Sequence, residues 1–221
     1  MIGACLSQGR AQTKSAVSYK NPVVDIAMPD PTVIKAADGY FYVYATESTR
    51  NVPIMKSKDL VEWTYCNTAF TNKTRPRFEP KAGIWAPDIN YINGKYVLYY
   101  AMSVWGGEQT CGIGVATANS PQGPFTDHGK MFRSNEIGEQ NSIDPSLLQY
   151  EGRNYLVWGS FRGIYVIELT ADGLSIMSGA KKKRIAGTAF EAVYIHKHGD
   201  YYYMFASIGS CCQGGKSTYK V

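Results

Sequence analysis

A fourfold internal repeat is the feature of this sequence that most constrains its fold. Aromatic-rich runs begin after Gly39, Gly94, Gly152 and Gly199, and a shorter apolar run precedes each of them. The segments between the paired runs, "AADG", "NG", "EG" and "HGD", have the composition of β-hairpin turns. A third strand can be read in the first three repeats and a fourth in the first two. The repeat therefore predicts an all-β chain of short antiparallel strands.

Each repeat begins with an acid: Asp30, Asp88, Asp144 and Glu191. A repeat of about 40 to 60 residues with four short strands per unit is typical of a β-propeller. The first strand of each propeller blade lies against the central channel, so we expect the four acids to converge on one axis. An Asp-Pro pair also starts a strand for purely local reasons, and a β-sandwich has many short strands too. Because like charges crowded together cost stability, a purely structural role for all four acids is the weaker interpretation.

Composition excludes several classes of function. Apolar residues make up 44% of the chain and charged residues 19%, so a packed core is expected. The net charge of +5 is small and scattered, and we interpret the basic run "KKKR" at 181–184 as a solvated loop between strands. We therefore expect no nucleic-acid partner. No stretch reaches the roughly 18 apolar residues of a membrane span, so no transmembrane segment is expected either.

The chain is divided into a flexible lead at 1–20 and a partial β-propeller catalytic domain at 21–221. "IGAC" at 2–5 resembles the end of a bacterial lipoprotein signal, although the apolar segment that should precede it is absent. The five cysteines have no CxxC spacing, so a zinc site is not expected. Cys211 and Cys212 are adjacent, and we interpret them as two packed thiols, with a disulfide between them as the alternative.

Eight segments give the chain a specific resemblance to glycoside hydrolase family 43, in particular to its arabinan-degrading branch. They run in family order from about residue 21 to the last residue: "MPDPTVI" at 28–34, "KSKDLVEW" at 56–63, "IWAPDI" at 84–89, "NGKYVLYYAMS" at 93–103, "NSIDPSLL" at 141–148, "GSFRGI" at 159–164, "FEAVYI" at 190–195 and "CCQGGKSTYKV" at 211–221. The resemblance implies an all-β, five-bladed β-propeller, here incomplete, with blades 1–3 and most of blade 4. It also implies inverting hydrolysis by three essential acids.

The resemblance implies a role for each acid. Asp30 matches the general base. Asp144 matches the acid that modulates the pKa of the proton donor and orients it, and Glu191 matches the general acid. Asp88 matches a residue of the site floor that transfers no proton. The predicted substrate-binding residues are Trp85, Asp88, Trp105, Asn141 and Ser160, with Trp105 the better sugar platform of the two tryptophans.

Inverting hydrolysis explains why carboxyl groups are needed. One protonated carboxyl serves the leaving oxygen and one carboxylate activates a water across the sugar ring, about 6.5–9.5 Å away. The environments of the two groups must hold their proton affinities apart. Asp30 must stay charged, so we expect it to accept hydrogen bonds from backbone groups or to lie beside a cation.

The chain also departs from the family pattern. We expect a fragment whose fourth blade ends in "STYKV" and whose fifth blade is missing, with weak activity as the consequence. No cofactor is required for the chemistry and no protein ligand for a metal is predicted. A structural calcium is implied by the resemblance, but none of His128, His196 and His198 matches its histidine position. In "EAVYI" an alanine stands where many relatives have glycine, and we expect it to be tolerated.

The predicted function is hydrolysis of α-1,5-linked L-arabinofuranosyl bonds in plant cell-wall arabinan. The alternatives are a β-xylosidase or α-L-arabinofuranosidase acting on arabinoxylan, and a catalytically silent carbohydrate-binding propeller. The predicted location is extracellular, periplasmic or on the outer surface of a bacterium as a lipoprotein. The sequence does not decide between endo and exo cleavage.

Overall fold

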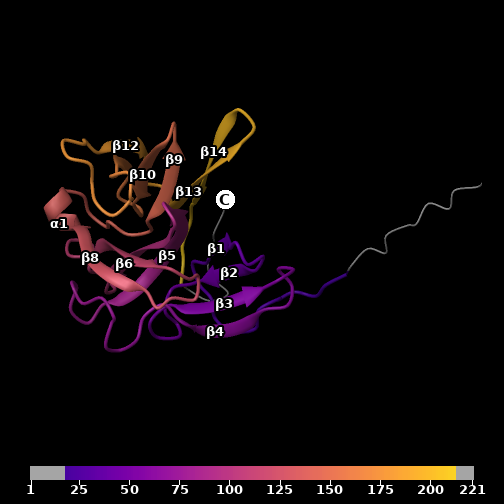
Figure 1. Ribbon diagram of the computed structural model, residues 1–221. Coiled ribbons are helices and arrows are strands. Elements are labelled where there is room, and N and C mark those ends of the chain that lie inside the picture. The colour runs from indigo at the N-terminus through magenta and orange to yellow at the C-terminus, as the bar shows by residue number, and fades with distance from the viewer. Residues whose placement is uncertain (1–17, 213–221) are drawn as a thin grey trace, which may run out of the picture.

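The computed structural model describes residues 18–212, which form three complete four-stranded antiparallel sheets and one further hairpin (Figure 1). The first sheet contains β1 (Thr32–Lys35), β2 (Phe41–Tyr44), β3 (Pro53–Ser57) and β4 (Thr64–Thr68). The second contains β5 (Gly83–Ile92), β6 (Lys95–Ser103), β7 (Gly112–Ala118) and β8 (Thr126–Arg133). The third contains β9 (Ser146–Tyr150), β10 (Arg153–Trp158), β11 (Ile164–Glu168) and β12 (Lys183–Ala186).

The hairpin consists of β13 (Glu191–His198) and β14 (Tyr201–Ser207), and one helical turn, α1 (Ser134–Ile137), follows β8. In every sheet the strands pair in sequence order, so the first strand of each repeat lies at one edge. These edge strands contact one another in succession, β1 with β5, β5 with β9 and β9 with β13. Successive sheets arranged in this way around an axis are the blades of a propeller. The all-β propeller fold is confirmed, with blades one to three complete.

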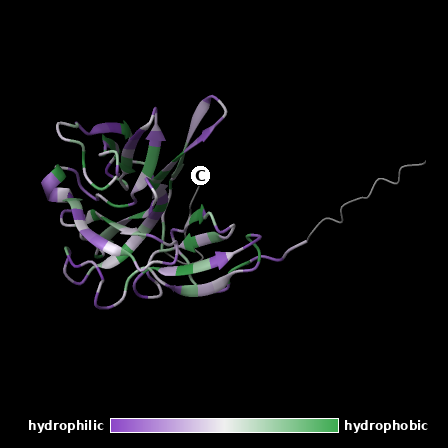
Figure 2. Cartoon of the chain, viewed as in Figure 1, coloured by the Kyte–Doolittle hydropathy of each residue, from purple (hydrophilic) through white to green (hydrophobic). Residues whose placement is uncertain are grey.

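The second blade is packed on both of its faces, which explains the continuous apolar run of β6. Leu98, Tyr100 and Met102 join a core with blade one, whereas Val97 and Tyr99 join a core with blade three. Because side chains alternate between the two faces of a strand, a strand between two neighbours must be apolar on both. In Figure 2 green hydrophobic segments are interspersed with white and purple ones along the strands, whereas α1 is mostly purple.

Most of the core tyrosines satisfy their hydroxyl groups inside the fold. The Tyr99 hydroxyl donates to the carbonyl of Gly173 at 2.8 Å, and that of Tyr100 donates to the Asp127 carboxylate at 2.5 Å. Tyr44 likewise donates to the Pro121 carbonyl. A tyrosine can be buried completely when its hydroxyl finds such a partner. The aromatic richness of the chain therefore serves the packing between blades as well as the exposed surface.

The fourth repeat packs one face of its hairpin on blade three and exposes the other. Val193, Ile195 and Ala206 pack with residues of β10 and β11. On the opposite face Tyr194 pairs with Phe205, His196 with Tyr203 and His198 with Tyr201. All four aromatic rings of that face are exposed. The segment "STYKV", where the fourth blade is expected to end, lies outside the described residues.

The structure corrects the prediction for the run at 181–184, and it describes almost none of the predicted lead at 1–20. The run at 181–184 is not wholly a loop, because β12 begins at Lys183 and forms the outer edge of blade three, where charged side chains stay in water. The lead at 1–20 falls almost entirely outside the described residues. In the part of the chain that the structure describes, no helix is long and apolar enough to cross a membrane.

Candidate active site

A left-handed backbone residue lies near the start of the inner strand in every blade, just before β1 and β9 and within β5 and β13. Asp30, Ala86, Asp144 and Ala192 have φ of 50°, 39°, 55° and 52°. Proline follows the first three of them and valine the fourth. Left-handed backbone is uncommon outside glycine, and aspartate tolerates it better than most other residues. The four positions are therefore equivalent in structure, and each presents one side chain at the same end of the axis.

This equivalence corrects the register of the acids. Asp30 and Asp144 share the left-handed position, but Asp88 lies two residues after it and Glu191 one residue before it. The pairing of the strands shifts register between Trp85 and Asp88 and again between Glu191 and Tyr194. Such bulges re-aim side chains at strand ends. The prediction that four acids occupy one equivalent position is therefore wrong for two of them.

A cavity of about 490 Å³ opens at this end of the axis. Its lining includes Asp30, Asp88, Asp144, Ala192, Tyr194 and Ser207. Every blade thus contributes to it through the first strand, and the fourth repeat does so through both strands of its hairpin. A concave site with a few convergent polar groups is the usual form of a ligand site.

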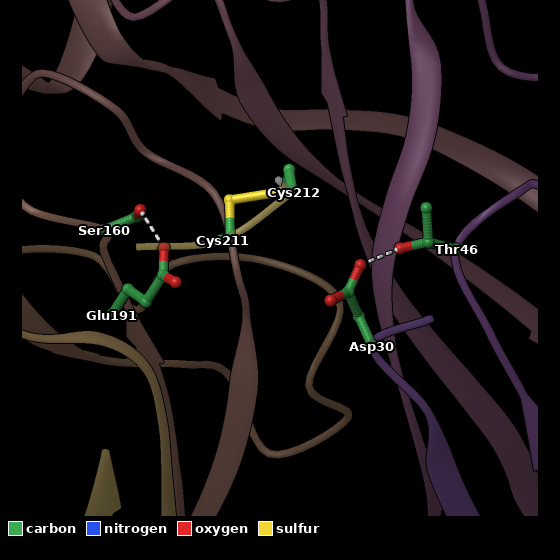
Figure 3. Close-up of a disulfide and its surroundings, with 6 residues drawn as sticks. All are labelled: Asp30, Thr46, Ser160, Glu191, Cys211 and Cys212. Atoms are coloured by element: carbon green, nitrogen blue, oxygen red, sulfur yellow. Dashed lines mark hydrogen bonds between the residues drawn. A yellow bond between two sulfur atoms is a disulfide. The ribbon is translucent and has the colours of Figure 1, made fainter. Parts of the chain in front are cut away.

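Asp30 is the exposed acid of the site. The hydroxyl of Thr46 donates to its Oδ2 at 2.6 Å (Figure 3). The N–H of Ala86 donates in turn to Thr46 Oγ1 at 2.7 Å. We expected Asp30 to accept from backbone groups or to lie beside a cation, but a side-chain hydroxyl holds it. Thr46 thus connects Asp30 to the backbone N–H of Ala86. It binds only Oδ2 of the carboxylate, so Oδ1 is not used by Thr46.

Asp144 is the acid whose proton affinity the structure alters most. Loss of hydration raises the pKa of Asp144 well above its ordinary value, and the charges of Glu191 and then Asp30 raise it further. A hydrogen bond from the N–H of Ala192 opposes the rise. Like charges raise a carboxyl pKa only over short distances. The three acids therefore lie close enough to interact, and Asp144 retains its proton to a higher pH than an ordinary aspartate.

Glu191 begins β13 and is buried. Ser160 Oγ donates to its Oε2 at 2.9 Å, and Ser160 also forms an isolated β-bridge with Glu191 (Figure 3). The Asn141 side chain donates to the Ser160 carbonyl at 2.8 Å. The two residues predicted to bind substrate thus form a chain of contacts that ends on Glu191. Their substrate contacts stay predictions.

Asp88 is a buried brace between three blades. Its carboxylate accepts from the N–H of Leu147 at 2.8 Å, from Asn90 Nδ2 at 2.7 Å and from Thr32 Oγ1 at 3.4 Å. Burial raises the pKa of Asp88 to about 6, and these hydrogen bonds oppose the rise. Although Asp88 borders the cavity, its oxygens are engaged by β1, β5 and β9. Its predicted role in substrate binding is not tested.

The two predicted aromatic platforms lie together. The rings of Trp85 and Trp105 have centroids 5.7 Å apart and planes inclined by 50°. Trp105 is 77% exposed, whereas Trp85 is half-buried against Ala101, Cys111 and Ile143. Neither lines the axial cavity, but Trp85 directly precedes Ala86, which does. Their predicted contact with substrate stays a prediction, and Trp105 offers the more accessible ring.

The described residues do not fit the calcium ion that the resemblance implies. Within residues 18–212 there is no group of three or more histidine, cysteine, aspartate or glutamate side chains that could hold a metal ion. The His128 ring bonds the Thr117 hydroxyl at 2.8 Å, and neither His196 nor His198 lines the cavity.

Sequence reasoning missed Thr46, Tyr194 and the bond between Cys211 and Cys212. Thr46 and Ser160 each lie two residues after the aromatic strand of their repeat, in "YAT" and "WGS". A hydroxyl recurring at this point was a usable signal for the hydrogen bonds to Asp30 and Glu191. Cys211 and Cys212 form a disulfide, so the prediction of two packed thiols was wrong and the alternative holds.

Comparison with known proteins places this site in a family. The family model described as "Glycosyl hydrolases family 43" matches residues 19–221. Extracellular endo-alpha-(1->5)-L-arabinanase 1 of Bacillus subtilis is 36% identical over 205 residues, which are 87% of this chain and 62% of that protein. Arabinan endo-1,5-alpha-L-arabinosidase A of Aspergillus niger is 32% identical over 83% of this chain and 59% of its own length. The chain thus spans about three fifths of each of these relatives.

Solved structures are similar over the same region. The endo-arabinanase of Bacillus licheniformis matches with a TM-score of 0.77 and 33% identity, covering 87% of this chain and 69% of that one. The Cellvibrio cellulosa α-L-arabinanase complexed with arabinohexaose matches with a TM-score of 0.76 and 29% identity, covering 88% and 69%. The likeness extends over nearly all the described residues.

Proposed function

The chain belongs to glycosyl hydrolases family 43, and from that premise we propose that the protein hydrolyses α-1,5-linked L-arabinofuranosyl bonds of arabinan with inversion at the anomeric carbon. The observation that carries the proposal is the proximity of three carboxyl groups, seen in the pKa of Asp144, which both Glu191 and Asp30 raise. Asp30 and Asp144 line the cavity, and Glu191 directly precedes Ala192, which lines it too. Relatives named as arabinanases support the choice of arabinan as substrate.

In the proposed reaction each acid has a separate task. Asp30, exposed and held by Thr46, is the base that takes a proton from the attacking water. Glu191, buried and oriented by Ser160, gives a proton to the leaving glycosidic oxygen. Asp144 transfers no proton. Its carboxyl lies close enough to Glu191 for their charges to repel, so the pair is favoured with a proton bound, which is the condition that the proton donor requires.

We further propose that the protein acts outside the cell on plant cell-wall arabinan. One relative is named as an extracellular enzyme, and a disulfide within the described residues suits an oxidising compartment. The finer assignments, a periplasmic or lipoprotein location, belong to the same proposal. They are distinguished by fractionating the native host and detecting the protein in medium, periplasm and membrane.

Product analysis tests the reaction. Proton NMR during hydrolysis of linear 1,5-arabinan should show the inverted anomer first, before mutarotation, and xylan should give no product. Retention of configuration would overturn the mechanism. Turnover of xylan without arabinan would assign the protein to β-xylosidase or arabinofuranosidase activity. Binding of arabinohexaose without hydrolysis of any substrate would assign it to the silent carbohydrate-binding class.

A further inference from the structure

The disulfide between the adjacent residues Cys211 and Cys212 lies at the candidate active site. In Figure 3 it is placed between Glu191 and Asp30, and the carboxyl groups of both acids point to the side on which the sulfur atoms lie. The connectivity explains this position. Ser207 pairs directly with Glu191 across the β13–β14 hairpin and lines the cavity, and Cys211 follows it after only three residues.

Two pairs of hydrogen-bonded polar side chains flank the disulfide. Asp30 and Thr46 lie on one side of it, and Glu191 and Ser160 on the other (Figure 3). Cys211 is half-buried and Cys212 is exposed. The sulfur pair is thus an apolar and accessible surface between two hydrogen-bonded carboxyl groups. A sugar needs both kinds of surface, because its hydroxyl groups bond carboxylates while its C–H groups prefer an apolar contact.

The bond also fixes the backbone of the site. Cys212 has a φ of 65°, in the left-handed region that residues other than glycine seldom adopt. Closing a ring between neighbouring side chains removes the freedom of both, so the sulfur surface is held in one place. Cys66 and Cys111, by contrast, are free thiols in blades one and two.

We propose that the Cys211–Cys212 disulfide is a sugar-binding element of the active site, packing against the C–H face of the arabinofuranosyl ring held between Asp30 and Glu191. This inference rests on the proposed function. It implies that binding is redox-dependent. A dithiol such as dithiothreitol reduces the S–S bond by two electrons and two protons, giving two cysteine thiols while the dithiol becomes a cyclic disulfide. The two freed side chains then rotate, and the fixed apolar surface is lost.

The test compares the oxidised protein, the same protein after dithiothreitol, and the protein reoxidised after removal of the reagent, with kcat and KM measured on linear 1,5-arabinan. Alkylation before and after reduction, read by mass spectrometry, verifies that Cys211 and Cys212 are modified only once reduced. We expect reduction to raise KM about tenfold, with a smaller change in kcat. Tenfold is the lower end of the discrimination that one apolar contact in a pocket provides. Reoxidation should restore KM.

Two variants control the test. Cys211→Ser/Cys212→Ser should reproduce the raised KM and be insensitive to dithiothreitol, whereas Cys66→Ser, which removes a free thiol from β4, should behave as the unmodified protein does. If the double variant does not fold, the reduced and reoxidised samples of the unmodified protein still decide. Equal KM in both redox states would overturn the inference and leave the proposed function standing. Absence of hydrolysis in every state would overturn the proposed function itself.

Discussion

At residue 192 an alanine occupies left-handed backbone, with φ of 52°, directly after Glu191. An L residue with a Cβ is strained there, by roughly 1–2 kcal/mol, whereas glycine is not. Ala192→Gly should therefore raise the free energy of unfolding by about 1 kcal/mol, less than the full strain because glycine also gains freedom in the unfolded chain. For a chain of this length the melting temperature should rise by about 2–4 °C, measured by thermal unfolding.

Ala101→Gly is the matched control. Ala101 is buried in β6, a regular strand position without positive φ, so the same change should lower stability there. A fall in melting temperature for both variants would contradict the strain at residue 192. That the fold tolerates this alanine could be expected from its small size. The backbone strain at residue 192 could not be expected, because the left-handed conformation depends on a register shift that the sequence does not reveal.

The two predicted proton-transfer residues should respond differently to the leaving group. Glu191→Gln should lower kcat on arabinan by about 10²–10⁴-fold, the usual worth of general acid catalysis, yet retain far more turnover on an aryl arabinofuranoside whose leaving group needs no proton. Asp30→Asn should lose turnover on both substrates, because no base remains to activate water. Asparagine also accepts left-handed backbone, so this variant adds no strain. Equal losses by Glu191→Gln on the two substrates would refute its role as general acid.

Among elements, β1, β5 and β9 come from three different blades and meet at Asp88. Asp88→Ala would leave the N–H of Leu147 buried without the acceptor that it now has at 2.8 Å. An unsatisfied buried donor costs about 1–3 kcal/mol. At about pH 5, where native Asp88 is mostly protonated and little buried charge is relieved, the free energy of unfolding by urea should fall by that amount. Asp88→Asn keeps an acceptor oxygen of the same shape, so it should lose much less. Similar losses in the two variants would show that the brace depends on charge instead.

The strands were largely predictable, since hairpin turns and aromatic runs recur in each repeat. The third strand β3 and the fourth strands β4 and β8 overlap the segments expected for them, although β4 and β8 end later than expected. The edge strand β12 was not, because its lysine and arginine side chains resemble a solvated loop when only composition is considered. The function of Asp88 was also missed at this scale. An acid near the start of an inner strand predicts a place at the axis, but not that neighbouring blades occupy its oxygens.

The molecule as a whole should become less stable as pH rises from about 4 to 7. Burial raises the pKa of Asp88 from 3.8 to about 6 and raises that of Asp144 well above 3.8. Between the unfolded and folded pKa the native state binds more protons than the unfolded chain, so stability falls with increasing pH in that window. Each unit of displacement is worth about 1.4 kcal/mol, which makes about 3 kcal/mol for Asp88 alone.

Asp144→Asn removes one of these groups, so its stability relative to the unmodified protein should increase steadily between pH 4 and pH 7 in urea unfolding. Asp172→Asn is the control of opposite sign. A hydrogen bond from Thr170 lowers the pKa of Asp172, so its carboxylate contributes stability above the unfolded pKa. That variant should not gain stability as pH rises. A constant difference between Asp144→Asn and the unmodified protein across the range would contradict the burial argument.

The left-handed turn that begins each inner strand has a consequence for how such a site can be redesigned. The backbone there delivers one side chain per blade to a shared centre, whatever that side chain is, so chemistry can be exchanged without altering the scaffold. Blade two carries Ala86 in this socket, at φ of 39° between Trp85 and Pro87. Aspartate is accepted in that conformation more readily than alanine. Ala86→Asp would therefore place a further carboxyl at the cavity that Asp30 and Asp144 line, with no change to the scaffold.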